Sequence, residues 1–361
     1  MRRNQHYGHW AGNGAKRHGH RGFLHGIAAC LCLLCLPAGA AGDRPVAQTL
    51  DAPPGAPPYR EGQYVHQPPS VAELRDDPDI HPQLKAMILL GRELFLNTQS
   101  LRGRYVFNDL SCGNCHPVEG RRAWSGPIWP AATTFPDYRN KNRHVNTLDE
   151  RIAGCFSYSM NGQPPASGSE EMVALMAYTR WLATGAPVYE DNIYGRGYSH
   201  LGKKMPEGSS RERGAAVYAE HCAVCHGDTG AGLRGRDGRL INPPLWGDGA
   251  YNWGSGMSRI FTAAAFIHLN MPFGRGGLLS EQQAWDVALF INSHERPQDP
   301  RYTGDVAATR ALYEDFHQFS LYGLRVDGRV LGDHDNTGEK TFLKPDIIRL
   351  RQADGATGTP P

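Results

Sequence analysis

Apolar residues recur at helical spacing in four segments of the chain, at residues 91–99, 170–183, 214–221 and 280–294. In the first and third segments a glycine precedes an apolar residue and an aromatic one, Leu94 with Phe95 and Val217 with Tyr218. The second and fourth segments are longer and carry an aromatic stripe. Such spacing is typical of helices that bury one face. The pattern therefore predicts a mainly α-helical protein in which one arrangement of helices occurs twice.

Segments rich in Gly, Pro and polar residues separate these helices and divide the chain. We expect a Pro-rich, extended N-terminal arm at 41–78, a first domain at 79–190, a linker at 191–210, a second domain at 211–300 and a C-terminal extension with a tail at 301–361. The end of the tail, 350–361, has a disordered composition, and residues 300–350 show no pattern that indicates a role. A chain of 361 residues is long enough for two domains, each with its own core.

Residues 1–40 have the composition of a targeting segment. Basic residues come first, an apolar stretch follows at 27–36, and small residues at 38–40 offer a cleavage site. The apolar stretch is shorter than the ~20 residues of a membrane-spanning helix. We therefore expect a cleaved signal peptide, export to the periplasm and no stable membrane insertion. Lipidation of Cys30 is an alternative, but most of the apolar stretch follows that cysteine. An uncleaved anchor is a minor one.

Removal of residues 1–40 takes away five basic residues and no acidic one, which changes the formal net charge from +2 to −3. A mildly acidic protein has no global attraction for nucleic acid, so nucleic acid is not an expected partner. An anionic ligand would need a local cluster of basic side chains.

Five of the eight cysteines follow residue 40, and four of these form two C-x-x-C-H motifs, at 112–116 and 222–226. This motif attaches haem c, because two thiols on one helical turn reach the vinyl groups and the histidine reaches the iron. A redox-active dithiol or half of a zinc site explains a single pair, but two pairs followed by histidine disfavour both. We expect two covalently attached haem c groups, bound by Cys112, Cys115, Cys222 and Cys225, with His116 and His226 as axial ligands.

The second axial ligand decides whether a haem carries electrons or binds small molecules. For the haem of the second domain, Met271 is favoured because it lies in a Met-Pro loop ahead of the last helix, and a thioether raises the reduction potential. Met257 and His268 are the competing candidates. For the haem of the first domain, the sequence leaves four candidates open: His144, Cys155, Met160 and Met172.

Cys155 is the remaining cysteine, outside both motifs. It lies in the segment 147–162, which begins with a capping box and ends in Asn-Gly, a pattern that predicts one short helix. In such a helix Arg151, Cys155 and Ser159 would share one face. Packing as a small hydrophobe is the commonest fate of a free cysteine. An unpaired thiol beside an arginine in an oxidising compartment instead indicates a reactive group, and both interpretations stay open here.

Taken together, these motifs resemble the dihaem c-type cytochromes of the thiosulfate dehydrogenase family, which join two thiosulfates into tetrathionate. The resemblance covers roughly residues 80–300 and rests on segments in one order, at 111–116, 147–162, 222–227, 263–274 and 284–297. It implies two tandem cytochrome c-like domains and an enzyme that acts on thiosulfate or tetrathionate. It also implies a soluble cytochrome c or a similar protein as the electron acceptor.

The resemblance assigns roles to single residues. The cysteine that matches Cys155 is the distal ligand of the first, catalytic haem, and the methionine that matches Met271 serves the second haem. The residues that match Arg151 and Ser159 line the substrate pocket. Some relatives carry a lysine before the methionine that can alternate with it on the iron, but Asn270 stands here, so that exchange is excluded.

A further arginine of the family's substrate site falls in the basic stretch 138–143 of this chain. Which of Arg139, Lys141 and Arg143 corresponds to it stays open. A solvated basic loop is the alternative interpretation of all three.

The resemblance also implies a reaction. Cys155 leaves the iron and bonds to the outer sulfur of a first thiosulfate, two electrons pass to the haems, and a second thiosulfate releases tetrathionate. A dihaem electron carrier, or the dihaem subunit of a sulfur-oxidising complex without its own catalysis, is the alternative; such subunits generally use cysteine at the second haem too. A dihaem peroxidase is disfavoured because it has no use for Arg151 beside Cys155.

Overall fold

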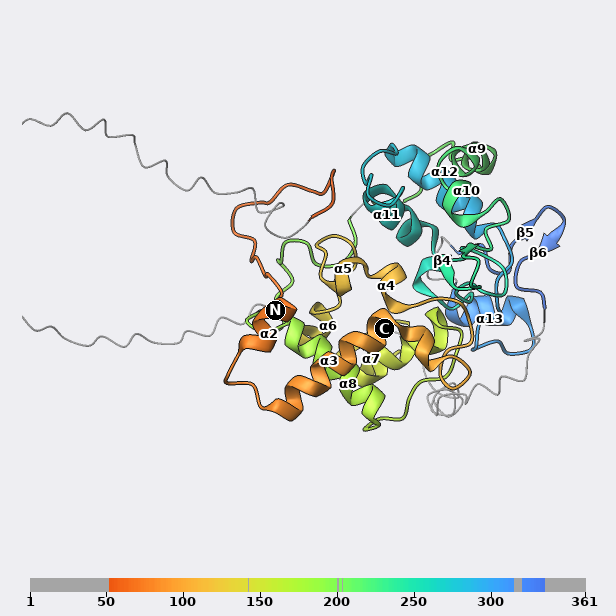
Figure 1. Cartoon of the computed structure of the whole chain (residues 1–361). Coiled ribbons are helices and arrows are strands. Elements are labelled where there is room, and N and C mark those ends of the chain that lie inside the picture. The colour runs from red at the N-terminus through yellow and green to blue at the C-terminus, as the bar shows by residue number, and fades with distance from the viewer. Residues whose placement is uncertain (1–51, 142, 200, 203, 315–319, 335–361) are drawn as a thin grey trace, which may run out of the picture. The chain divides into compact units, whose positions relative to one another are not determined.

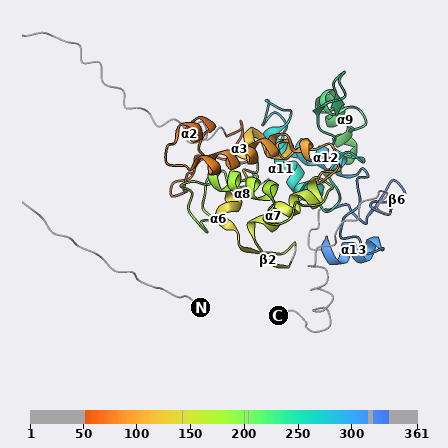
Figure 2. The same cartoon turned by 60° about the horizontal axis from the view of Figure 1, so that its bottom comes forward.

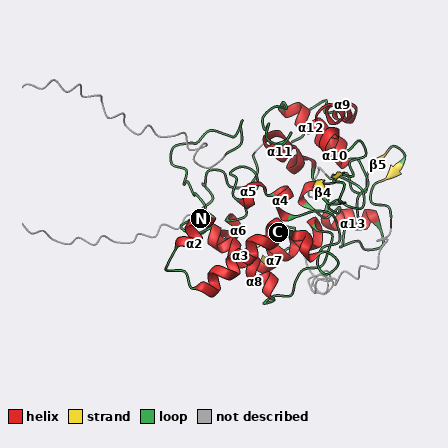
Figure 3. Cartoon of the chain, in the orientation of Figure 1, coloured by secondary structure: helices red, strands yellow, loops and turns green. Residues whose placement is uncertain are grey.

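The computed structural model describes residues 52–334 except 142, 200, 203 and 315–319 (Figure 1). The predicted signal peptide and the predicted disordered end of the tail lie outside the described residues. The described part is mainly helical, as expected, with long irregular connections and short strands (Figure 3). Within these ranges no helix is both long enough and apolar enough to cross a membrane.

The first domain is built on two long helices, α3 (Pro82–Leu96) and α8 (Glu170–Leu182), which lie side by side in Figures 1 and 2. Gly91 lies at their crossing, where an added Cβ would be 2.0 Å from the Ala174 carbonyl oxygen. Glycine is needed because any side chain would push the two backbones apart. The buried core around the crossing includes Leu94, Phe95, Leu175, Tyr178 and Trp181.

The second domain repeats this arrangement with α9 (Arg211–His221) and α12 (Glu281–Asn292), and α11 (Ile260–Asn270) packs against α12. At this crossing an added Cβ on Gly214 would be 2.0 Å from the Asp286 carbonyl oxygen. The core includes Val217, Tyr218, Ile260, Trp285 and Val287. The apolar-aromatic pairs that the sequence pattern picked out are thus core residues of two equivalent crossings.

The connections hold the shorter helices α2 (Val71–Asp76), η1 (Thr98–Leu101), α4 (Cys112–Cys115), α5 (Pro117–Gly120), α6 (Pro130–Thr134), α7 (Leu148–Gly154), η2 (Cys155–Ser159), α10 (Ala223–His226), η3 (Gly256–Ser258) and α13 (Val306–Tyr313). The strands form antiparallel pairs: β1 (Asp137–Arg139) with β2 (His144–Asn146), β3 (Leu233–Arg234) with β4 (Leu240–Asn242), and β5 (Arg325–Val326) with β6 (Arg329–Val330). The single turns α4 and α10 carry the two C-x-x-C-H motifs.

The helix predicted at 147–162 starts as expected but does not continue as one regular helix. Thr147 and Glu150 form the predicted capping box at the start of α7. The chain then winds as a π-helix through η2, in which the Met160 N–H donates to the Cys155 carbonyl oxygen. A π-turn takes in one extra residue, which an apolar pattern of helical period does not reveal. The expectation of a single regular helix is therefore corrected.

The segments outside the two helix pairs also contribute buried residues. The arm, expected to be extended, contains α2, and Leu74 of this helix belongs to the core of the first domain. Ile193 and Tyr194 of the predicted linker are buried. In the C-terminal extension, Tyr322 packs against Trp253 of the second domain in a small buried cluster. The described parts of the arm, the linker and the extension therefore contribute to the packed fold.

Candidate active site

The first C-x-x-C-H motif and Cys155 line one cavity. The cavity has a volume of about 360 Å³, and Cys112, Cys115 and His116 line it together with Cys155 and Ser159. Apolar side chains from α3, α8 and the loop before α6 line it as well, among them Phe95, Ile128 and Leu175. The fold thus brings the lone cysteine to the haem-attachment motif, as the resemblance implied.

Both motif histidines have Nδ1 next to a backbone carbonyl oxygen, an arrangement that suits an axial haem ligand. His116 Nδ1 lies 2.5 Å from the Gly126 carbonyl oxygen, and His226 Nδ1 lies 2.7 Å from the Pro243 carbonyl oxygen. A ring that donates from Nδ1 keeps the lone pair of Nε2 for iron. Burial lowers the pKa of His116 to about 4, which favours the neutral, coordinating ring. The cysteine pairs, these histidines and the apolar walls fit haem c in both domains.

Arg151 holds the thiol of Cys155 from one helical turn away. Its Nη1 lies 3.0 Å from Cys155 Sγ, as the spacing of four residues predicts. Interaction with the charge of Cys155 raises the pKa of Arg151. The pair therefore places the sulfur of Cys155 next to a fixed cation.

Arg139, the last residue of β1, supplies a second guanidinium to the same cavity. Burial and the charge of Arg151 lower the pKa of Arg139 to about 10, because cations that share a poorly solvated space repel each other. No Asp or Glu is among the described residues that line this cavity. The cavity therefore favours an anionic ligand, which would relieve the repulsion.

The other two basic residues of this stretch do not line the cavity. The Lys141 Nζ donates to the Gly254 carbonyl oxygen at 2.5 Å and lies 3.6 Å from the centre of the Tyr158 ring. Arg143 is exposed, and its Nη2 lies 3.3 Å from the Leu312 carbonyl oxygen. Of the three basic candidates, the structure brings only Arg139 to the cavity that Cys155 lines.

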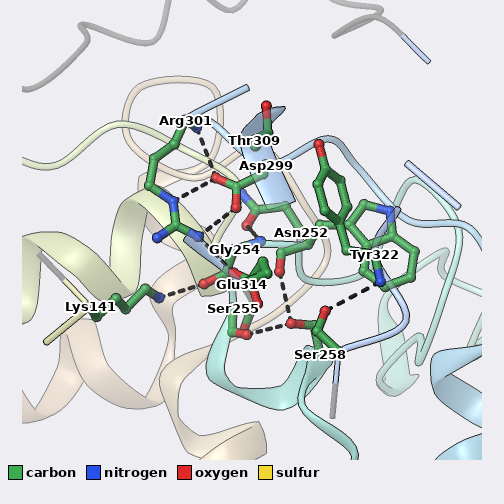
Figure 4. Close-up of polar contacts among 12 residues, drawn as sticks. Lys141, Asn252, Gly254, Ser255, Ser258, Asp299, Arg301, Thr309, Glu314 and Tyr322 are labelled. Carbon is green, nitrogen blue, oxygen red and sulfur yellow. Dashed lines mark hydrogen bonds and ion pairs between the residues drawn. The ribbon is translucent and has the colours of Figure 1, made fainter. Parts of the chain in front are cut away.

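Lys141 belongs to a buried ionic cluster that the C-terminal extension supplies (Figure 4). Arg301 donates to Asp299 at 2.5 and 2.9 Å and to Glu314 at 2.9 Å. Its guanidinium also lies 5.1 Å from the centre of the Tyr158 ring. Tyr158 belongs to the same π-turn as Cys155. Burial, together with the charges of nearby arginines, lowers the pKa of Lys141. The extension therefore contacts the segment that carries Cys155.

Sequence reasoning did not anticipate two residues at the site. Arg196, from the predicted linker, lines the first cavity and is paired with Asp191. Ser255, from the second domain, has its Oγ 3.4 Å from Ser159 Oγ. Both lie far from Cys155 in the chain and in no motif, so only the fold could place them here.

A second cavity of about 340 Å³ surrounds the second motif. Cys222, Cys225 and His226 line it, and so do the two candidate ligands Met271 and Met257. His268 is not among the lining residues. The geometry thus narrows the candidates for the second axial position to two methionines.

The two cavities are neighbours, because Cys115 lines both of them. Asn270, in the place of the lysine that some relatives carry, is buried and lines the second cavity. Its Oδ1 accepts a hydrogen bond of 2.7 Å from Ser125 Oγ. Ser125 directly precedes Gly126, whose carbonyl oxygen contacts His116.

Two of the four candidates for the first distal ligand remain. His144 and Met172 do not line the first cavity, whereas Cys155 and Met160 do. Met160 is buried in the core of the first domain, where a thioether serves as packing. Cys155, with its fixed guanidinium, is the candidate that carries chemistry.

Family models match both domains. Residues 105–188 match the model described as "SoxA/TsdA, cytochrome c domain". Residues 209–291 match the model described as "Cytochrome C oxidase, cbb3-type, subunit III". The two matches show two cytochrome c domains in tandem, as the repeated helices and motifs predicted.

Curated relatives and a solved structure match across both domains. The chain is 44% identical over 314 residues to a thiosulfate dehydrogenase of Thiomonas intermedia (strain K12), covering 85% of this chain and 96% of the relative. It is 46% identical over 273 residues to a thiosulfate dehydrogenase of Stutzerimonas stutzeri (strain A1501), covering 75% and 86%. A solved structure, thiosulfate dehydrogenase (TsdBA) from Marichromatium purpuratum in the "as isolated" form, is 48% identical with a TM-score of 0.68. That match covers 76% of this chain and 58% of the solved chain. The chain therefore belongs to the thiosulfate dehydrogenase family and is a c-type cytochrome with two haem domains.

Proposed function

We propose that this protein oxidises thiosulfate, joining two molecules into tetrathionate and passing two electrons to an external acceptor. The observation that carries the proposal is the cavity in which Cys155, paired with Arg151, meets the first haem-attachment motif and Arg139. The names of the relatives support the same substrate. A sulfur nucleophile in a cationic, haem-binding cavity suits the oxidation of a sulfur anion.

The cavity must offset a repulsion between anions. Thiosulfate is a dianion, and two dianions brought together repel each other more strongly as water is excluded. Arg151 and Arg139 offset this repulsion by charge-assisted hydrogen bonds, and Ser159 adds a hydroxyl donor. The absence of a carboxylate among the described lining residues leaves this attraction undiminished.

The covalent chemistry belongs to Cys155. The Cys155 thiolate bonds to the outer sulfur of a first thiosulfate, and this new S–S bond releases two electrons. The outer sulfur of a second thiosulfate then attacks the cysteine-bound sulfur, forms tetrathionate and returns the thiolate, as in thiol–disulfide exchange. Arg151 holds the sulfur before and after each step. When bound, the two haem c groups serve as the acceptors of these electrons.

The residues that line the two cavities support an assignment of haem ligands. We assign the first to Cys112, Cys115 and His116 with Cys155 as distal ligand, and the second to Cys222, Cys225, His226 and Met271. With a thiolate ligand in the first domain and a thioether ligand in the second, bound haem groups would have the lower potential in the first domain and the higher in the second. A soluble cytochrome c or a similar protein is the proposed acceptor. The targeting segment at 1–40 and the haem c motifs favour a periplasmic location.

The experiment uses the purified protein with both haems attached, thiosulfate and ferricyanide. We expect two ferricyanide ions to be reduced for each tetrathionate formed, without any other protein present. A dihaem carrier, or a subunit of a sulfur-oxidising complex, would leave thiosulfate unchanged in this assay. That result would overturn the proposed function.

A further inference from the structure

The π-turn that carries Cys155 is held from outside its own helix. The helix ends at Ser159, so the carbonyl groups of its last turn have no partner within it. Asn252 Nδ2 donates to the Ser157 carbonyl oxygen at 2.8 Å, and Asn252 N–H donates to the Tyr158 carbonyl oxygen at 3.2 Å. One residue thus donates hydrogen bonds to two successive carbonyl groups of the turn.

Asn252 lies in the second domain, in the loop between β4 and η3. It is fully buried, and its amide is fully used. Nδ2 also donates to Asn161 Oδ1 at 3.3 Å, where the helix ends, and Oδ1 accepts from the Gly254 N–H at 3.1 Å. Because its amide nitrogen and its amide oxygen are both hydrogen-bonded, the Asn252 side chain has one favoured orientation. It can therefore fix the conformation of the π-turn.

A second buried asparagine fastens the same loop to the same turn. Asn108 Nδ2 lies 2.7 Å from the Ser159 carbonyl oxygen and 3.1 Å from the Ala250 carbonyl oxygen. The loop also fits tightly against the turn, because an added Cβ on Gly254 would lie 2.5 Å from the Tyr158 ring. The contact between domain two and the π-turn is therefore built from backbone, amide and aromatic groups together.

We propose that Asn252 is a positioning residue for Cys155, through which the second domain holds the reacting sulfur of the first. A π-turn is a wide and uncommon helical turn that is frequent at functional sites. Without the Asn252 side chain, the Ser157 carbonyl loses its donor and the turn can relax toward a regular helix. Cys155 would then shift relative to Arg151 and His116. The role of Asn252 rests on the proposed function only in naming Cys155 as the reacting sulfur.

The test compares Asn252→Ala with Asn292→Ala in the protein with both haems attached. Asn292 is an equally buried asparagine of the second domain, but its amide donates within α12, to the Ala288 carbonyl oxygen. The main readout is the rate at which iodoacetamide alkylates Cys155, followed by peptide mass spectrometry. The second readout is the electron paramagnetic resonance spectrum of the first haem, which reports its distal ligand.

We expect Asn252→Ala to raise the alkylation rate about tenfold, which is what the loss of one or two buried hydrogen bonds allows. The first-haem spectrum should change, kcat should fall more than KM rises, and Asn292→Ala should match the unmodified protein. Asn252→Asp keeps the acceptor for Gly254 and removes the donor to Ser157, so it should act in the same direction if the alanine variant folds poorly. An alkylation rate and spectrum unchanged in both Asn252 variants would overturn the proposal. Failure of thiosulfate turnover in the unmodified protein would overturn the proposed function alone, because alkylation reads Cys155 without substrate.

Discussion

At the scale of single residues, charge sets the preference of the first cavity. Arg139 and Arg151 line it, and no carboxylate is among the described lining residues. The lowered pKa of Arg139, caused by burial and by Arg151, means that the protein leaves this cation without full compensation. A bound dianion would compensate the positive charges of Arg139 and Arg151. Affinity for thiosulfate should therefore depend on each of these guanidinium groups.

Replacing Arg139 by Gln should raise KM for thiosulfate roughly 10- to 100-fold, since a charge-assisted hydrogen bond in a poorly solvated site is lost. Arg151→Gln should raise KM similarly and also lower kcat, because Arg151 contacts Cys155 Sγ. Arg143→Gln is the matched control and should leave both constants unchanged, because Arg143 is exposed outside the cavity. Steady-state kinetics with ferricyanide measure all three. An equal effect of Arg143→Gln would contradict this account of the cavity.

The chemistry that sequence could predict was local. Arg151 and Cys155 meet because a spacing of four residues on a helix determines their contact. The three basic residues of 138–143 could not be separated, because one hairpin sends Arg139 into the cavity and Arg143 to the surface. Asn252 carried no signal at all, since Ser157, to which its side chain donates, lies 95 residues away in the sequence. Contacts between distant segments depend on the fold.

At the scale of elements, the two domains share one packing solution. Each pairs an early helix with a late one, and each needs a glycine where the backbones cross, Gly91 in the first domain and Gly214 in the second. The apolar residues at helical spacing and the glycine before each apolar-aromatic pair predicted these helices. The π-turn after α7 escaped prediction, because it depends on hydrogen bonds from the second domain rather than on local pattern.

Gly214→Ala should destabilise the second domain by roughly 1–3 kcal/mol, because the new methyl group would overlap the Asp286 carbonyl and overpack the crossing. Gly256→Ala, where an added Cβ meets nothing within 4 Å, is the control and should leave stability nearly unchanged. Thermal unfolding followed by circular dichroism measures the difference. Equal midpoints for the two variants would show that the crossing is looser than described.

At the scale of the whole molecule, the two domains meet at neighbouring cavities and at one loop. The cavities share Cys115 in their walls, and the loop of Asn252 reaches from the second domain to the π-turn of the first. The C-terminal extension, for which the sequence indicated no role, places Arg301 beside Tyr158. Electrons released at Cys155 would leave through the second haem, whose potential depends on its methionine ligand.

Met271→Leu should lower the midpoint potential of the second haem, since a thioether ligand raises it and leucine cannot bind iron. Turnover with ferricyanide should slow, while both haems stay covalently attached. Met257→Leu is the matched control in the same cavity and should leave the potential unchanged. Potentiometric titration followed by visible absorption distinguishes the two. A shift with Met257→Leu and none with Met271→Leu would reverse the assignment of the ligand.

The most direct measurement of the central claim is thiosulfate turnover by Cys155→Gly. Cys155 lies outside both attachment motifs, so the variant should keep two covalent haem groups, counted by mass spectrometry of the intact chain. Its thiosulfate-dependent reduction of ferricyanide and its formation of tetrathionate should fall to background, because no sulfur remains to bond to the substrate. Normal turnover by a variant that holds both haems would contradict the assignment of Cys155 as the reacting residue.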